Sequence, residues 1–173
     1  VPFSDKTLDA EFAATTSRAK LENWLWFAGM VLTGIWLLTG NCIQKRKLKA
    51  LPDSRDAALL AELEAVKVLV GVDNKVRICI KEGVETTFLT RMRGQYGIAL
   101  ESGFDAAERR QVLLHELTHL KHGDLGGNQS AALILAICWW NPVIWLAFRR
   151  FRRDMEIYCD YDAARLSGDK KAY

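Results

Sequence analysis

A stretch without any charged side chain, residues 23–44, constrains the fold of this chain more than any other feature. Its centre, from Trp24 to Thr39, is almost entirely apolar, and Trp residues stand towards both of its ends. A helix of about 20 apolar residues crosses the hydrocarbon core of a bilayer. Border Trp and a Lys/Arg cluster beyond the end are typical of such a helix. We therefore predict a transmembrane helix over residues 22–44, with a buried core helix as the alternative.

The segments on either side of this stretch are polar. Residues 1–21 lack the charged start and short apolar core of a signal peptide, and we expect a flanking loop there, with an amphipathic lead-in to the apolar stretch as the alternative. We expect a basic linker at residues 45–54 whose cations contact anionic lipid headgroups. No nucleic-acid-binding motif accompanies the basic clusters, so no direct binding of nucleic acid is expected. The chain begins with Val, which favours a piece of a longer protein.

Residues 55–173 are predicted to form one domain on the cytoplasmic side. The four Cys have no CxxC spacing and are expected to be reduced thiols, which suits that compartment. An amphipathic helix follows the linker and ends near Gly71. Three runs then have the alternation of β-strands, at 76–80, 86–92 and 95–100, with turns at Gly83 and at Arg93-Gly94. The predicted fold class is therefore α+β, with a small β-sheet.

A second helix, predicted over residues 105–122, carries the pattern for metal binding. Asp105 and Glu108 have the spacing of a capping box. The helix contains His115-Glu116-Leu117-Thr118-His119, which is HExxH. Two His four residues apart stand on one helical face and reach one ion, while Glu116 projects beside them as a base. Three protein ligands and one open position define a catalytic zinc site. A surface helix with incidental His residues is the plainer alternative.

The third ligand has to come from elsewhere, because position 125, a His in the metzincin pattern, is Leu. Glu156 on a later predicted helix is the preferred ligand, and Asp160, one turn further, is placed to accept a hydrogen bond from a ligand His. The plainer alternative is that both acids balance neighbouring arginines. Weaker candidates for these roles are Asp154, Asp162 and Cys159, and candidates for stabilising an oxyanion are Tyr158 and Tyr161.

Residues 125–148 form a second uncharged run, between the two parts of this site. A single crossing of the membrane would separate Glu156 from the His pair and would translocate four Arg, against the positive-inside rule. Pro142 breaks a helix and disfavours helix at the residue before it. We therefore predict an apolar helix–turn–helix that is re-entrant or membrane-associated. A tight hairpin of two true crossings is the alternative.

Three segments complete the pattern: His115-Glu116-Leu117-Thr118-His119-Leu120-Lys121-His122-Gly123-Asp124, Trp140-Asn141-Pro142-Val143-Ile144-Trp145 and Arg153-Asp154-Met155-Glu156-Ile157-Tyr158-Cys159-Asp160. Together they closely resemble the BlaR/MecR family of membrane metallopeptidases. The resemblance implies a gluzincin-type protease domain facing the cytoplasm in a multi-pass protein of the bacterial cell membrane. It implies zinc held by His115, His119 and Glu156, with Glu116 as the base. In sensor members, an extracellular penicillin-binding domain signals to the protease, which is linked to self-cleavage and loss of a gene repressor.

The predicted function is hydrolysis of peptide bonds by a membrane-embedded zinc metalloendopeptidase in regulatory signal transduction, as in the sensing of β-lactam antibiotics. Its expected substrate is its own chain or a transcriptional repressor, and a homodimer is a possible assembly. The residues Gln95, Tyr96, Gly97 and Ile98 are expected to pair with an extended substrate by β-augmentation. The alternatives are an HtpX-like membrane quality-control protease and a non-catalytic signalling module with a structural zinc.

Overall fold

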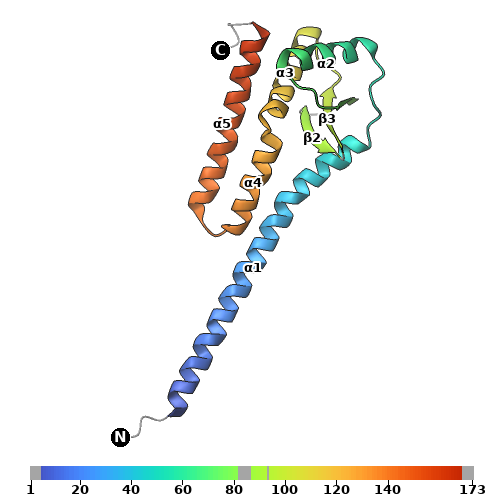
Figure 1. Ribbon diagram of the computed structural model, residues 1–173. Coiled ribbons are helices and arrows are strands. Elements are labelled where there is room, and N and C mark those ends of the chain that lie inside the picture. The colour runs from blue at the N-terminus through green and yellow to red at the C-terminus, as the bar shows by residue number, and fades with distance from the viewer. Residues whose placement is uncertain (1–4, 82–86, 93, 169–173) are drawn as a thin grey trace.

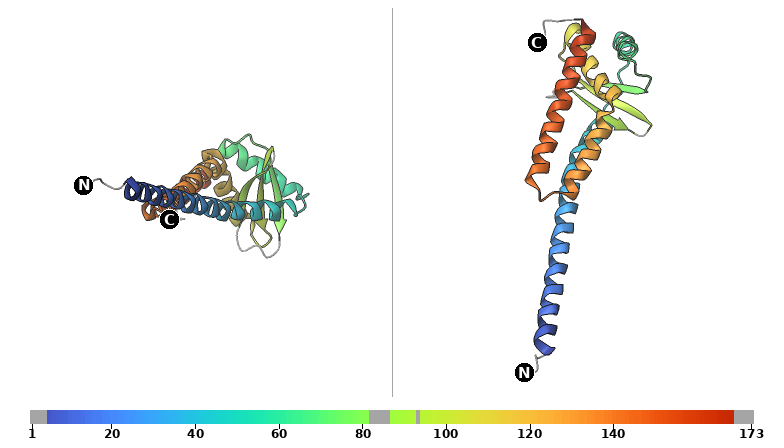
Figure 2. Two further views of the ribbon diagram at one scale, coloured as in Figure 1. Left: turned by 90° about the horizontal axis from the view of Figure 1, so that it is seen from below. Right: turned by 60° about the vertical axis from the view of Figure 1, so that its left-hand side comes forward.

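One long helix dominates the shape of the molecule in the computed structural model, which describes residues 5–81, 87–92 and 94–168 (Figure 1). This helix, α1 (Asp5–Lys49), extends from the N-terminal end to a group of elements around its C-terminal end. That group comprises α2 (Ala57–Val70), β1 (Val76–Lys81), β2 (Phe88–Met92), β3 (Gln95–Glu101), α3 (Ala106–His122), α4 (Asp124–Ile137) and α5 (Pro142–Ser167). Helices α4 and α5 form a hairpin that lies along α1 (Figure 2).

Helix α1 is longer than the sequence predicted. Residues 5–21 are helical rather than a flanking loop, and residues 45–49 are helical rather than part of a linker. The reason is composition: Ala, Leu, Lys, Arg and Glu are good helix formers, and no Pro interrupts the segment. Pro52 explains where the helix stops, because it disfavours helical backbone at the residue before it.

The apolar part of α1 is exposed. The side chains of Trp24, Leu32 and Trp36 are 69%, 68% and 62% exposed. A core helix would bury such side chains, so this exposure contradicts the alternative of a buried core helix. Among the described residues, α1 is the one helix long and apolar enough to cross a membrane.

The central strand of the sheet is β3, which pairs in parallel with β1 and antiparallel with β2. The three strands lie close to the runs that alternation predicted. Gly94, after β2, has a φ of 80°, which suits the predicted turn because glycine adopts this conformation without strain. Three other positions in the predicted strands and turns, Gly83, Thr86 and Arg93, lie outside the described residues.

The hydrophobic core lies between the sheet and the helices α2 and α3. Its fully buried side chains include Leu59, Leu63, Val66, Ile78, Ile98, Leu100, Leu113, Leu114 and Leu117. The predicted capping box of Asp105 and Glu108 is present at the start of α3, and Gly123 ends the helix with a φ of 73°. Because three leucines of α3 are locked in the core, the rotation of α3 about its axis is fixed. The direction of its HExxH side chains is fixed with it.

Alternate residues of the strands face the end of α1. There, Cys79 and Ala99 are buried against Leu48. Gly97 of β3 permits this close approach, since a Cβ at that position would lie 2.2 Å from Cδ2 of Leu48. The end of the apolar helix is thereby attached to the sheet, and its last two turns come to lie beside the strands.

Over residues 125–148 the structure has a helix, a turn and a second helix, which is the arrangement that Pro142 predicted. Asn141 caps α5 by accepting a hydrogen bond from the backbone N–H of Val143 at 2.9 Å. Proline at the first helical position needs no hydrogen-bond partner for its nitrogen. The chain therefore reverses here without leaving a polar group of Pro142 unpaired.

The turn of this hairpin rests on α1. The indole N–H of Trp139 donates to the backbone carbonyl of Trp26 at 3.1 Å, and the rings of Trp36 and Trp145 lie 6.1 Å apart. A Cβ on Gly29 would lie 2.1 Å from the Trp139 ring, so glycine is needed for this approach. The hairpin and the apolar part of α1 thus form one continuous apolar unit.

Candidate metal centre

Two imidazoles of α3 and one carboxylate of α5 meet at one point. The Nε2 atoms of His115 and His119 are 3.0 Å apart, and one oxygen of Glu156 lies 3.5 Å from the first and 3.4 Å from the second. We call this arrangement the donor triangle. A tetrahedral zinc ion with bonds of about 2.0–2.1 Å needs ligand atoms about 3.3 Å apart. The donor triangle therefore has the dimensions and the atom types that suit zinc.

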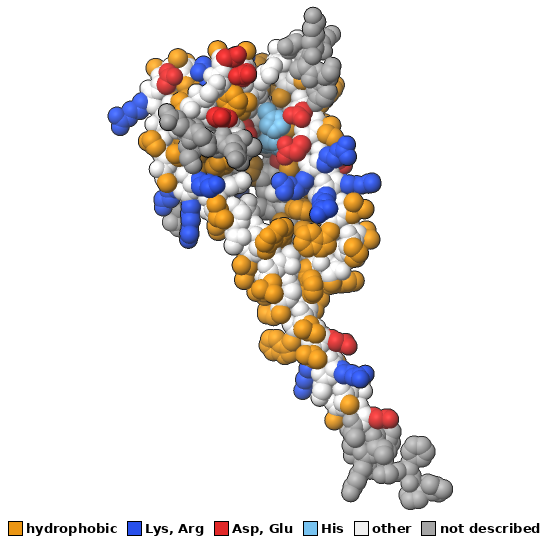
Figure 3. Space-filling view, turned by 180° about the vertical axis from the view of Figure 1, so that it is seen from behind, with side chains coloured by type: hydrophobic (Ala, Val, Ile, Leu, Met, Phe, Trp, Pro, Cys, Tyr) orange, Lys and Arg blue, Asp and Glu red, His pale blue; other side chains and the backbone are white. Residues whose placement is uncertain are grey.

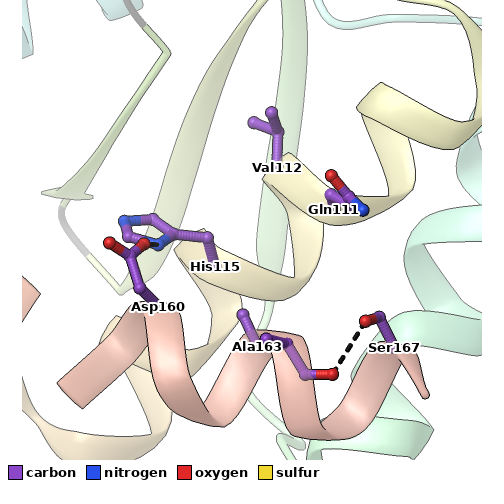
Figure 4. Close-up of a pocket in the computed structure, with 7 residues that line it drawn as sticks. Gln111, Val112, His115, Asp160, Ala163 and Ser167 are labelled. Carbon is purple, nitrogen blue, oxygen red and sulfur yellow. Dashed lines mark hydrogen bonds and ion pairs between the residues drawn. The ribbon is translucent and has the colours of Figure 1, made fainter. Parts of the chain in front are cut away.

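An aspartate stands behind each imidazole of the donor triangle. The Nδ1 atom of His115 lies 2.9 Å from Asp160, and the Nδ1 atom of His119 lies 2.7 Å from Asp124. In Figure 4 the carboxylate of Asp160, on α5, faces the His115 ring. A carboxylate at Nδ1 accepts the N–H of a neutral imidazole, which leaves Nε2 free as a ligand and fixes the ring orientation.

The partner of His119 was not found from the sequence. Asp124 is the first residue of α4 and follows the glycine that ends α3. The φ of 73° at Gly123 redirects the chain, so that Asp124 lies beside the helix it has just left. The sequence does contain a signal for this partner, because Asp124 directly follows the glycine that ends the helix and stands five residues after His119.

Cys159 lies on the far side of the His119 ring from the donor triangle. Its sulfur is 3.1 Å from Nδ1 of His119 and 3.1 Å from a carboxylate oxygen of Asp124. These three groups could themselves hold an ion. However, burial, reinforced by the hydrogen bond to Asp124, raises the pKa of the thiol. In the metal-free protein the thiol is therefore protonated and donates to Asp124.

Glu116 is a buried acid beside the donor triangle, with only 7% of the residue exposed. The pKa of its carboxyl is raised from 4.5 to about 7 overall; burial has the largest effect, and the charge of Glu156 acts in the same direction. The charge of His119 and a hydrogen bond from the backbone of Leu89 act in the opposite direction. A carboxyl with a pKa near neutrality can both accept and return a proton at that pH.

The donor triangle opens into a cleft of about 470 Å³. Its walls come from the end of α1, from β2, from α4 and from α5. Figure 3 shows His side chains in a hollow of the surface, with acidic side chains next to them. A second groove of about 430 Å³ starts at His115 and runs between α3 and α5 (Figure 4). Because His115 lines both, the cleft and the groove adjoin at the donor triangle.

Two tyrosines predicted to stabilise an oxyanion lie elsewhere. Tyr158 and Tyr161 are 57% and 58% exposed, and neither lines the cleft or the groove. Residues two and five positions after Glu156 on a helix point away from it, which is the reason for this correction. Tyr158 instead packs its ring 4.8 Å from that of His122.

The weaker ligand candidates are also outside the donor triangle. Asp162 pairs with His122, at 3.1 Å between the carboxylate and Nε2. Asp154 is exposed and lines neither the cleft nor the groove. His122, the third His of the chain, therefore pairs with Asp162 outside the donor triangle.

The strand predicted to pair with a substrate is the wrong strand. Gln95, Tyr96, Gly97 and Ile98 belong to β3, which is hydrogen-bonded on both sides by β1 and β2. In the described part of the sheet β1 and β2 are the edge strands, and β2 is the one beside the cleft, which its residues Phe88, Leu89, Thr90 and Arg91 line. Apolar alternation reveals where strands lie but not their order in the sheet, which explains the error.

Comparison with known proteins gives one family and several relatives. The family model described as BlaR1 peptidase M56 matches residues 4–173. The regulatory protein BlaR1 of Bacillus licheniformis is 39% identical over 72 residues, which cover 42% of this chain and 12% of that protein. The methicillin resistance mecR1 protein of Staphylococcus aureus is 32% identical over 59 residues, covering 34% of this chain and 10% of that protein. The matched segments thus span only a small part of these relatives.

Loss of either supporting aspartate should weaken zinc binding. We expect Asp124→Asn and Asp160→Asn to lower zinc affinity by about 10–100-fold, because the imidazoles lose their fixed tautomer and orientation. The effect of Asp124→Asn should be larger, since the Asp124 side chain is 15% exposed and that of Asp160 is 57% exposed. Competition with a coloured zinc chelator in detergent measures the zinc affinity of both variants.

Asp162→Asn is the matched control, because it removes an aspartate–His pair from the same helix away from the donor triangle. Its zinc affinity should equal that of the unmodified protein. Equal losses for all three variants would contradict the assigned roles.

The raised pKa of Glu116 predicts a pH dependence for the metal-free protein. A carboxyl whose folded pKa is raised from 4.5 to about 7 contributes stability at low pH that is lost as pH rises through 7. At pH 8, Glu116→Gln should therefore raise the free energy of unfolding by up to about 3 kcal/mol. Near pH 4.5 the gain should fall below about 0.5 kcal/mol, because Glu116 is protonated in the folded state and already half-protonated in the unfolded state. Urea unfolding with a chelator present measures the free energy of unfolding of both proteins at each pH. A gain of equal size at both pH values would refute the raised pKa of Glu116.

Proposed function

The chain belongs to the BlaR1 peptidase M56 family, and from this membership and the donor triangle we propose that it is the catalytic part of a membrane-embedded zinc metalloendopeptidase of the gluzincin type. The observation that carries the proposal is the meeting of His115, His119 and Glu156 beside the buried Glu116. Two imidazoles and a carboxylate leave one coordination position open, as in catalytic zinc sites.

The proposed reaction needs a Lewis acid, held by the donor triangle, and a general base, which is Glu116. Zinc at the donor triangle would supply Lewis-acid activation of a water molecule and of the scissile carbonyl. Glu116, which is buried and lines the cleft beside the donor triangle, accepts a proton from the attacking water and delivers it to the leaving nitrogen.

The edge strand β2 is the proposed binding site for the substrate main chain. In the described sheet β2 pairs with β3 along one edge only, and its residues Leu89 and Arg91 line the cleft. Along the other edge, every second residue of a strand presents its backbone groups outward. They are available to an extended substrate, which would add a strand to the sheet.

Two further polar atoms favour a bound main chain in this cleft. The side-chain oxygens of Thr87 and Asn128 are buried and have no hydrogen-bond partner among the described residues, and both residues line the cleft. Buried polar atoms are costly when unpaired. A peptide segment lying along β2 would offer them amide partners.

The proposed location is the bacterial cell membrane, in a multi-pass parent protein. The apolar part of α1 and the α4–α5 hairpin would lie in the bilayer, the latter as a re-entrant unit. Basic clusters follow both apolar runs and favour a cytoplasmic position for the donor triangle. We propose a regulatory substrate, either the parent chain or a transcriptional repressor; the names of the relatives, a regulatory protein and a methicillin resistance protein, support this role.

Replacing the proposed base tests the function. Glu116→Gln should reduce peptide cleavage by at least about 100-fold, because general-base catalysis contributes about 10²–10⁴-fold. Zinc content should stay at one ion per chain, since Glu116 is not a ligand. Metal analysis and a peptidase assay on the detergent-solubilised protein measure the two properties separately.

Glu64→Gln serves as the control, because it removes an exposed carboxylate of α2 far from the cleft. It should cleave at the unmodified rate. Unimpaired cleavage by Glu116→Gln would overturn the proposed mechanism.

A further inference from the structure

We infer that the site acts on polypeptides anchored in the membrane and cuts them a few residues from the point where they leave the hydrocarbon core. The inference names a substrate class and rests on the proposed function. It follows from the height of the cleft above the apolar belt, which we define as the exposed apolar side chains of α1 and of the α4–α5 hairpin. The residues of α1, α4 and α5 each give a separate measure of this height.

Helix α1 gives the first measure. The cleft is lined by Asn41, Gln44 and Lys45, which stand at the very end of the uncharged stretch. Ile43, between them, is 52% exposed and belongs to the apolar belt. The wall of the cleft and the edge of the apolar belt therefore share the same turn of helix.

Helix α4 gives the second measure. Asn128 and Gln129 line the cleft, whereas Leu133 and Ile134 are 63% and 54% exposed and belong to the apolar belt. Four residues of helix rise about 6 Å. The lower edge of the cleft thus lies about 6 Å above apolar side chains that a bilayer would cover.

Helix α5 gives the third measure. Val143 and Leu146 are 66% and 54% exposed, and the first cation, Arg149, follows shortly after. Glu156 of the donor triangle comes seven residues later, which is a rise of about 10 Å. A tilted helix would place the donor triangle lower still, so this distance is an upper limit.

All three measures place the cleft within about 10 Å of the apolar belt, and the surface shows the same layering. In Figure 3 a band of Lys and Arg side chains separates the hollow containing the His residues from the hydrophobic surface beyond it. Lys45 and Arg152 belong to the cleft wall and suit the level of lipid phosphates. An extended chain advances about 3.3 Å per residue, so a height of about 6–10 Å corresponds to about two to three residues.

This geometry favours an anchored substrate over a free one. The anchor of the substrate can stay in lipid beside the apolar belt while the adjoining residues reach β2. Anchoring also confines the substrate to the layer that contains the cleft, which raises its effective concentration. A substrate with a longer polar segment after its membrane anchor can still enter the cleft. The peptide bond that reaches the donor triangle is then determined by its distance from the membrane rather than by its distance from the chain end.

The experiment measures the position of the cut. The unmodified protein is reconstituted in vesicles of phosphatidylcholine and phosphatidylglycerol with single-span substrates, each carrying a 20-residue stalk of varied sequence. A second set has four Gly/Ser residues inserted directly after the span, and a third consists of the stalks alone. Mass spectrometry locates each cut, and Glu116→Gln in parallel vesicles shows which cuts depend on the site.

We expect the cuts to cluster about two to three residues from the span in both anchored sets, at the same distance although the insertion has shifted the stalk sequence. The stalks alone should be cut at least about 10-fold more slowly at equal bulk concentration, because they lose the local concentration. Cuts that move with the stalk sequence, or equal rates for free stalks, would overturn the inference and leave the proposed function standing. Absence of any cut that depends on Glu116 in all three sets would overturn the proposed function itself.

A variant of the apolar belt provides a second readout. Leu133→Lys introduces a charge into the belt on α4, outside the cleft. It should slow cleavage of anchored substrates several-fold and leave cleavage of free stalks unchanged. Leu60→Lys, at a residue that is 40% exposed on α2, is the matched control and should change neither. Equal effects of Leu133→Lys on anchored and free substrates would count against the inference.

Discussion

The site depends on the packing of α5 against α3, because these helices supply the donor triangle from positions about forty residues apart in sequence. Helix α3 is fixed by leucines locked in the core, and Ala163 of α5 is part of the same core. The α4–α5 hairpin carries the chain away from α3 and returns it antiparallel. Glu156 is the residue that the returning helix brings level with His115 and His119.

The concentration of acids around the two imidazoles explains why a cation suits this place. Four carboxyl groups lie there: Glu116, Asp124, Glu156 and Asp160. In the described residues the ion pairs of the last three are formed with His rather than with Lys or Arg. Burial and the neighbouring Glu156 raise the pKa of Glu116, which shows the cost of so many acids together. A divalent cation at the donor triangle would offset this repulsion at its source.

Much of the fold and the site could be read from the sequence, where local chemistry decides the outcome. The capping box at Asp105 and the break at Pro142 are local signals, and both appear in the structure. The choice of Glu156 rested on its spacing to Asp160. The remainder depends on contacts between distant segments: Asp124 folds back on His119, and β3 enters the middle of the sheet. Neither periodicity nor composition records such contacts.

The central claim is that one zinc ion is held by two imidazole nitrogens and the carboxylate of Glu156. X-ray absorption at the zinc edge of the zinc-loaded, detergent-solubilised protein tests it most directly. The account predicts nitrogen and oxygen neighbours at about 2.0–2.2 Å and loss of the bound zinc in Glu156→Ala. A sulfur neighbour at about 2.3 Å would place the ion at Cys159 instead, and unchanged zinc coordination in Glu156→Ala would equally contradict the account.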